Sequence, residues 1–217
     1  ERAGRVCYKS EDKINDGTAE KFIRGIIKSG HESVIEHESI SVKVICDRGV
    51  THEIVRHRIA SYSQESTRYC NYTADKFSNQ ISCIDVATGF HYDLTTEADQ
   101  KKYDIWNRAM EAAEKYYFEM VQAGAKPEEA RSILPNSLKT EIVMTMNMRE
   151  WRHFIRLRGS KAAHPQIREI TDMSYPGIGK MFDRDHTTIL SSCEIVSKKI
   201  ASAPANTPAS IISLKSR

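Results

Sequence analysis

The segment from residue 97 to residue 123 limits the fold of this chain more than any other stretch. Apolar side chains recur there at steps of three and four residues, which is typical of one face of an amphipathic helix. The positions are Tyr103, Trp106, Met110, Ala113, Tyr117 and Val121. Gly124 and Pro127 follow and are expected to end the helix. This stripe is predicted to pack in a core or a subunit interface, not to line a cofactor.

The other segments predict a mostly helical chain with a small sheet. Apolar residues alternate with polar ones from Ser39 to Cys46, which is the pattern of a half-buried strand. A short strand is expected at residues 80–86, inside a polar stretch from 61 to 96. The expected helices cover residues 18–28, 50–58, 97–123, 128–134, 136–148 and 149–158.

Charge, apolar runs and cysteine content argue against three classes of protein: those that bind nucleic acid through bulk positive charge, those that span a membrane, and disulfide-rich proteins. The chain has 32 Lys and Arg against 29 Asp and Glu, a net charge of +3, so any anion site must be local. No apolar run approaches the roughly 20 residues that span a bilayer. The five cysteines form no C-x-x-C pair, which argues against a disulfide framework or a zinc site and predicts a reducing, cytoplasmic location. We expect no signal peptide, although the sequence begins at Glu1 rather than Met.

One local concentration of cations lies between Arg56 and Arg68. If Arg56, His57 and Arg58 were helical, they would point about 100° apart, so at least one would face the protein. A buried guanidinium needs an anionic partner. The hydroxyl groups of this segment add further donors, from Ser61, Ser63, Ser66 and Thr67. Two interpretations stay open at this point: an anion-binding site, or a solvated turn with salt bridges to Glu53 and Glu65.

A second polar cluster follows near residue 150. On a helix, Asn147, Arg149, His153 and Arg158 would share nearly one side, while Met148, Trp151 and Ile155 would face the core. Such a stripe without an acid suggests a wall for an anionic or planar ligand. The alternative is a solvated cationic face.

A possible metal site at residues 31–37 is not expected to bind metal. His31, Glu36 and His37 are suitable ligand types, but their order is not H-E-x-x-H and no third spaced ligand follows. We therefore predict no metal.

Four segments of the chain occur in a telling order: "SGHESVIEH" at 29–37, Arg56-His57-Arg58 followed by Ser66, "RSILP" at 131–135, and "NMREWRHFIRLRGSKAAHPQIREI" at 147–170. In this order they resemble the flavin-dependent thymidylate synthases (ThyX). The resemblance covers residues 1–170. It implies a ThyX-like α/β (α+β) fold, mostly helical with a small central sheet, in a homotetramer with shared active sites. It also implies methylation of dUMP to dTMP with FAD, NADPH and methylenetetrahydrofolate, without a cysteine nucleophile.

The resemblance also implies roles for individual residues. Residues expected at FAD are Ser33, Glu36, Arg56, His57, Arg58, Ile59, Gln64, Asn147, Arg149 and His153. Residues expected around the nucleotide are Glu53, Arg56, Gln64, Glu65, Ser66, Thr67, Arg68 and, from another subunit, Arg131. Ser66 and Arg68 are expected on its phosphate. Arg158 is expected against the uracil ring, where it would favour the ionised ring and so act as the catalytic residue.

The chain departs from that family after Ile170. The run "IGKMFDRDHTTIL" is similar to the helix-turn-helix of the bacterial replication initiator DnaA, with Arg184 to Thr188 opening the recognition helix. We therefore expect a synthase domain over 1–170, a helical extension over 171–201 and a flexible tail over 202–217. The alternative function is a nucleotide- or DNA-binding regulatory protein that uses Arg184 to Thr188. The alternative for the extension is a terminal helix that packs on the tetramer and does not bind DNA.

Overall fold

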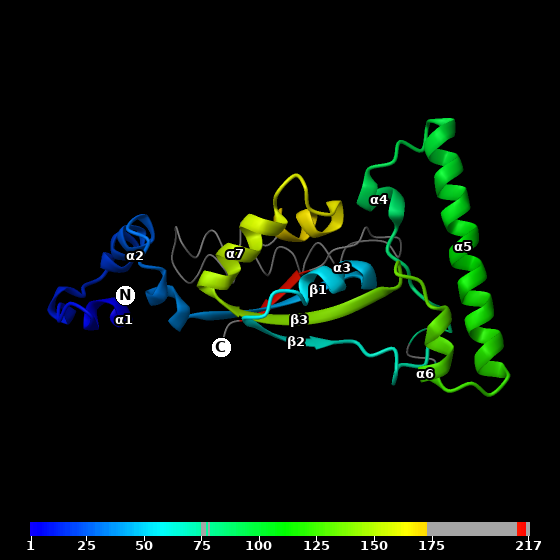
Figure 1. Ribbon diagram of the computed structural model, residues 1–217, viewed down its shortest axis with the longest axis horizontal. Helices are drawn as coiled ribbons and strands as arrows, with labels where there is room; N and C mark the ends of the chain where they lie inside the picture. The colour runs from blue at the N-terminus through cyan, green and yellow to red at the C-terminus, as the bar shows by residue number, and fades with distance from the viewer. Residues whose placement is uncertain (75–76, 78, 173–211, 216–217) are drawn as a thin grey trace.

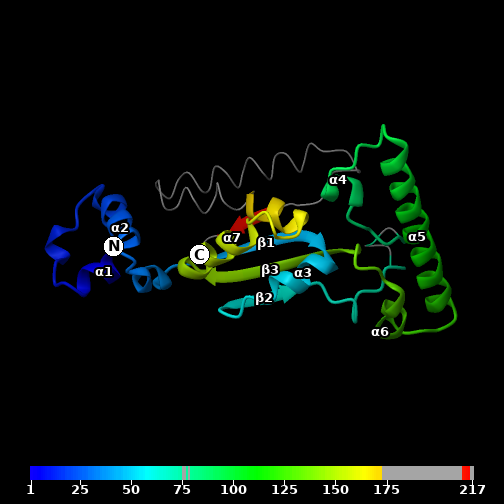
Figure 2. The same cartoon turned by 45° about the horizontal axis from the view of Figure 1, so that its top comes forward.

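The computed structural model describes residues 1–74, 77, 79–172 and 212–215. These residues form a mixed α+β fold that extends along one axis (Figure 1). The short helix α1 (Arg2–Val6) and helix α2 (Thr18–Lys28) lie at one end, and the long helix α5 (Glu97–Gln122) lies at the other. The turned view in Figure 2 keeps the same order, with the sheet between the two helical ends.

The sheet is built on two long antiparallel strands. Strand β1 (Ser39–Asp47) pairs with β3 (Lys139–Asn147) over its whole length, from Ser39 opposite Asn147 to Asp47 opposite Lys139. Strand β2 (Ala60–Gln64) pairs with the other edge of β3, and the short β4 (Ile212–Lys215) pairs with β1. The strand order is therefore β2-β3-β1-β4.

One face of this sheet is apolar and forms the main core. Val42 and Val44 of β1 lie opposite Met144 and Ile142 of β3, and all four are fully buried. Two helices cover this face, α3 (Arg48–Ile54) and α7 (Met148–Arg158), and a helical segment over 165–172 adds Ile167 and Ile170. Because each strand alternates, every second residue reaches the helices.

Four of the expected elements are confirmed. Helix α2, strand β1, helix α5 and helix α7 lie within one residue of the predicted bounds. The Thr96 hydroxyl begins α5 by accepting a hydrogen bond from the Asp99 backbone N–H. Tyr117 of the predicted aromatic stripe is fully buried and packs in a second core cluster with Tyr72 and Leu138.

The predicted helix over 136–148 is wrong. Residues Lys139–Asn147 form strand β3, in which Thr140, Ile142, Met144 and Met146 are buried and their neighbours face outward. The methionines of this segment and Leu138 favour a helix by intrinsic propensity. The segment is nevertheless a strand, because it pairs with β1 and buries every second side chain. The helix expected over 128–134 is shorter than predicted: α6 (Pro127–Ala130) continues as the 3-10 turn η4 (Arg131–Ile133).

The segment after α3 also differs from the prediction. The helix expected over 50–58 begins earlier and ends at Ile54, so Arg56, His57 and Arg58 lie in a turn. The Tyr62 hydroxyl lies 2.9 Å from the Ile54 carbonyl oxygen and 2.7 Å from that of His57, which ties the end of α3 to β2. Strand β2 was not predicted. The strand expected over 80–86 is a single bridge between Cys83 and Leu138, followed by helix α4 (Val86–Phe90).

Only a small part of the C-terminal predictions can be compared with the structure, because residues 212–215 are the one described segment after residue 172. The helix-turn-helix resemblance, with Arg184 to Thr188, falls outside the described residues, so it stays a prediction. Residues 212–215 form β4 within the segment expected to be a flexible tail, because the open edge of β1 offers backbone groups for pairing. None of the described helices combines the length and the apolar character that a membrane span requires.

Candidate active site

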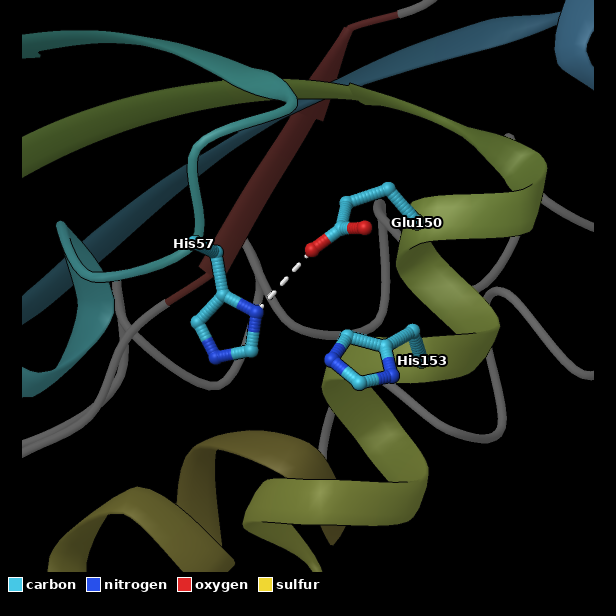
Figure 3. Close-up of side chains that lie close together, drawn as sticks. All are labelled: His57, Glu150 and His153. Atoms are coloured by element: carbon cyan, nitrogen blue, oxygen red, sulfur yellow. Dashed lines mark hydrogen bonds and ion pairs between the residues drawn. The ribbon is translucent and has the colours of Figure 1, made fainter.

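The centre of the site is a buried histidine in the turn between α3 and β2. His57 is 5% exposed, and its ring packs edge-on against Phe154 at 4.9 Å between centroids. Its Nδ1 lies 3.0 Å from Oε1 of Glu150 in the first turn of α7 (Figure 3). Asn147 fixes this turn, because its side-chain oxygen accepts the Glu150 backbone N–H at 2.9 Å. The helix on which the sequence argument for Arg56–Arg58 rested is not formed, but one of these three side chains does face the protein, that of His57.

Arg158, at the other end of α7, completes a chain of four side chains. Its Nε donates to His57 Nε2 at 3.1 Å, its Nη1 donates to Glu53 Oε2 at 2.8 Å, and its Nη2 donates to the Glu53 carbonyl oxygen at 2.9 Å. The connected order is Glu150, His57, Arg158, Glu53. The site therefore joins the end of α3 to both ends of α7.

The hydrogen bonds settle the protonation state of His57. A guanidinium only donates, so His57 Nε2 must carry a lone pair and the ring proton of neutral His57 must sit on Nδ1, facing Glu150. Burial lowers the pKa of His57 most, the positive charge of Arg158 and the nearby His153 lower it further, and Glu150 opposes them. His57 and Glu150 thus form a hydrogen bond between a neutral ring and a carboxylate, not an ion pair.

Arg158 keeps hydrogen-bonding capacity for a ligand. A guanidinium has five N–H groups. Three of them are used by His57 and Glu53, and the other two have no partner among the described residues. The side chain is 16% exposed, so part of it is accessible to a ligand from solvent.

A metal ion would compete with this arrangement. Ligand atoms of His57, Glu150 and His153 lie within 4.8 Å of one another, the one such group in the described residues. Both ring nitrogens of His57 already have partners, however, and one of those partners is a cation. A divalent ion would have to displace Arg158, so the geometry favours the hydrogen-bonded chain. His31, Glu36 and His37 form no comparable group in the described chain.

The cations on either side of His57 are available to an anion. Arg56 and Arg58 are exposed and have no ion-pair partner in the described part of the chain, and Ile59 beside them is 68% exposed. The salt bridges considered for a solvated turn are not formed. Glu53 binds Arg158, and Glu65 accepts a hydrogen bond from the Tyr72 hydroxyl at 2.8 Å.

The expected nucleotide residues lie along the segment that leaves β2. Gln64 donates to the Thr51 hydroxyl at 3.1 Å, and Thr67 is buried. The Ser66 hydroxyl accepts the Arg68 backbone N–H at 3.3 Å. The exposed side chain of Arg68 pairs with Glu128 of α6 at 3.0 Å, and α6 leads directly into the 3-10 turn that begins with the exposed Arg131.

The polar side of α7 receives acids from a distant segment. The 3-10 helix η2 (Glu32–His37) places Glu36 against Arg149, and Glu32 lies 3.6 Å from Arg149 and 3.4 Å from Arg152. The stripe that contained no acid in sequence is therefore partly paired in the structure. Ser33 and His153 are exposed.

Sequence reasoning missed two residues that hold the site together. Glu150 and Tyr62 belong to no motif of binding residues, and only the tertiary structure shows what they contact. One signal for Glu150 was available: it precedes Phe154 by four residues, so on a helix it lies on the same side as that large apolar residue.

Two of the described cysteines, Cys46 and Cys83, are poor candidates for a nucleophile. Burial raises the pKa of the Cys46 thiol to about 12 and that of Cys83 to about 11. A thiol needs to be a thiolate to react, so neither is reactive at neutral pH.

Comparison with known proteins identifies the family. The Thy1 family model, described as thymidylate synthase complementing protein, matches residues 1–182. The chain belongs to the Thy1 family. The match continues past Ile170, where the motif resemblance ended, and includes residues 173–182, which are not described.

Relatives of this Thy1 chain are named flavin-dependent thymidylate synthases. The Pyrococcus furiosus protein is 36% identical over 168 residues, which is 77% of this chain and 65% of the relative. The Geobacter sulfurreducens protein is 35% identical over 175 residues, which is 77% of this chain and 71% of the relative. A Mycobacterium protein (strain JLS) is 36% identical over 192 residues, with 78% and 70% covered. The Thy1 chain thus spans about two thirds of the length of these relatives, and less than two thirds of the first.

Proposed function

We propose that this chain is the subunit of a flavin-dependent thymidylate synthase. It would convert dUMP to dTMP, with methylenetetrahydrofolate as one-carbon donor and NADPH as reductant through FAD, and release tetrahydrofolate and NADP⁺. The names of the relatives support the reaction class. The observation that carries the proposal is Arg158, an anchored guanidinium that contacts His57 and keeps two N–H groups without a partner among the described residues. Arg56 and Arg58, on either side of His57 in the sequence, likewise have no ion-pair partner in the described chain.

The residues of the site fit a flavin dinucleotide. Unpaired guanidinium groups bind phosphate oxygens through charge-assisted hydrogen bonds, which suits Arg56 and Arg58 to the diphosphate. The exposed Ile59 offers an apolar contact for a ring system. Ser33 and Glu36 of η2, Arg149 and His153 of α7, and Asn147 just before α7 would hold the rest of FAD. When bound, FAD supplies the reducing equivalents for the reaction.

The nucleotide would lie between the β2 segment and Arg158. The phosphate of dUMP would take Ser66 and Arg68, with Glu53, Gln64, Glu65 and Thr67 around it. Arg68 would exchange Glu128 for the phosphate at small cost, because exposed ion pairs contribute only about 0–1 kcal/mol. The free N–H groups of Arg158 would then donate to a uracil carbonyl oxygen.

Arg158 would act on charge that develops in the ring. A fixed cation beside the uracil stabilises its ionised form, which raises electron density at the carbon to be methylated. The guanidinium does not move to do this, because His57 and Glu53 hold it in place before the substrate arrives. His57 presents no free ring nitrogen, so its contribution to FAD would be a contact through the ring edge.

The active sites would be completed by other subunits of a homotetramer. Large apolar side chains remain exposed around the site, namely Ile59, Tyr69 and Leu157, and such side chains commonly mark an interface or a ligand site. Arg131 would reach the nucleotide of a neighbouring subunit. The unpaired cysteines of the described chain suit a reducing cytoplasm.

A visible absorption spectrum of the purified protein tests this proposal. We expect flavin bands that bleach anaerobically on addition of NADPH, faster when dUMP is present, and dTMP formation when methylenetetrahydrofolate is added. A protein that cannot be reconstituted with FAD, or that binds FAD but forms no dTMP, contradicts the proposal.

A further inference from the structure

The feature with no assigned role is the buried carboxylate of Glu150. It lies in the first turn of α7, 9% exposed, while the proposed catalytic Arg158 lies in the last turn of the same helix. Glu150 and Arg158 contact opposite nitrogens of one imidazole ring, that of His57. The two charged residues are therefore coupled through the ring.

The tautomer of His57 decides whether Arg158 can keep its contact. With the proton on Nδ1, the ring donates to Glu150 and accepts from Arg158. With the proton on Nε2, two N–H donors would face each other at 3.1 Å, and the bond to Arg158 would be lost. A carboxylate accepts and does not donate, so Glu150 selects the first state.

The contact at Nε also completes the orientation of Arg158. Glu53 holds Nη1 and Nη2, which leaves the guanidinium able to swing about that edge. The third bond, at Nε, fixes its plane and thereby the direction of the two free N–H groups. His57 itself is held by the Tyr62 hydroxyl on its carbonyl oxygen and by the ring of Phe154.

We propose that Glu150 is a positioning residue that acts through His57 to fix the orientation of the Arg158 guanidinium toward the substrate. This inference rests on the proposed function for the role of Arg158 in the reaction, but its structural part, the tautomer of His57, can be measured without turnover.

The first test compares Glu150→Gln with the wild type and with a matched control. The control is Glu20→Gln, which removes one exposed carboxylate paired with Arg24 on α2. For Glu150→Gln we expect kcat to fall roughly 10- to 100-fold, with KM for dUMP within about threefold of the wild type, because an orienting partner acts mainly on the transition state. Glu20→Gln should keep the wild-type kcat.

A spectroscopic measurement separates this role from a merely structural one. In protein labelled with ¹⁵N-histidine, we expect His57 of the wild type to carry its proton on Nδ1 alone, and Glu150→Gln to populate the Nε2–H tautomer. An Nε2–H tautomer in the wild type would overturn the proposal even if Glu150→Gln fails to fold.

Two variants of His57 provide a rescue experiment. The amide of His57→Gln can accept from Arg158 and donate to Glu150, whereas His57→Leu can do neither. We expect His57→Gln to retain at least about tenfold more turnover than His57→Leu. Equal kcat for Glu150→Gln and wild type, or equal turnover of the two His57 variants, would overturn the inference. Absence of dTMP formation by the wild type would instead refute the proposed function, and the tautomer would still decide the role of Glu150.

Discussion

Replacing Arg158 by alanine tests the site most directly, and the structure gives the size of two separate effects. The first is on stability. The variant loses three hydrogen bonds, and it leaves the buried Nε2 of His57 without a donor. An unsatisfied buried acceptor costs about 1–3 kcal/mol, and the partly solvated pair with Glu53 adds at most about 1 kcal/mol.

We therefore expect Arg158→Ala to fold, with a free energy of unfolding lower by about 1–4 kcal/mol. For a domain of this size that lowers Tm by roughly 2–16 °C. Thermal unfolding followed by circular dichroism measures this change. The matched control is Arg156→Ala, because Arg156 is an exposed arginine on the same helix. Its Tm should stay within about 1 °C of the wild type.

The second effect is on catalysis and is much larger. Losing one preorganised donor to developing charge costs about 10²- to 10³-fold in kcat, and Arg158 offers two donors and a full charge. We expect dTMP formation to fall by at least roughly 10³-fold, with the flavin spectrum retained. The assay follows dTMP by chromatography at a temperature where both variants are folded. Wild-type turnover by Arg158→Ala would refute the catalytic role of Arg158. Loss of FAD together with turnover would refute the expectation that Arg158 contacts the substrate and not the cofactor.

Three further predictions follow from the same structure. Trp151→Ala should lower the free energy of unfolding in urea denaturation by about 3–5 kcal/mol, because it empties a fully buried site and removes the N–H that donates to the Ile40 carbonyl oxygen. An unchanged free energy of unfolding would contradict the core described above. The pKa of His57 lies below its ordinary 6.5 in the folded protein, so the unfolded chain binds the extra proton and the free energy of unfolding should fall as pH drops below about 6.5, by at most about 1.4 kcal/mol per pH unit. His57→Gln should flatten this pH dependence between about pH 7.5 and 5. Ser66→Ala should raise KM for dUMP about tenfold with little change in kcat, and a complete loss of chemistry at normal affinity would indicate a catalytic hydroxyl instead.

Local pattern was sufficient where one face of an element is apolar and its ends are marked. Helix α5 could be predicted from its aromatic stripe and from the residues that bound it, and β1 from strict alternation. Strand β3 could not, because its methionines favour a helix locally, while the hydrogen bonds that make it a strand come from β1, about a hundred residues earlier in the chain.

The candidate active site, too, could be predicted only in part from the sequence. The sequence by itself determined which chemical groups are present: the cations of the Arg56–Arg68 segment, and Arg158 on the helix that also carries His153 and begins after Asn147. Only the tertiary structure decided which of these groups stay free. In the folded chain, His57 is buried between Glu150 and Arg158. Glu53 pairs with Arg158, and Glu36 pairs with Arg149. Arg56 and Arg58 have no ion-pair partner in the described chain. The physical reason is that a hydrogen bond or an ion pair depends on distances of about 3 Å, and residues a hundred positions apart reach that distance only when the sheet and its covering helices have formed.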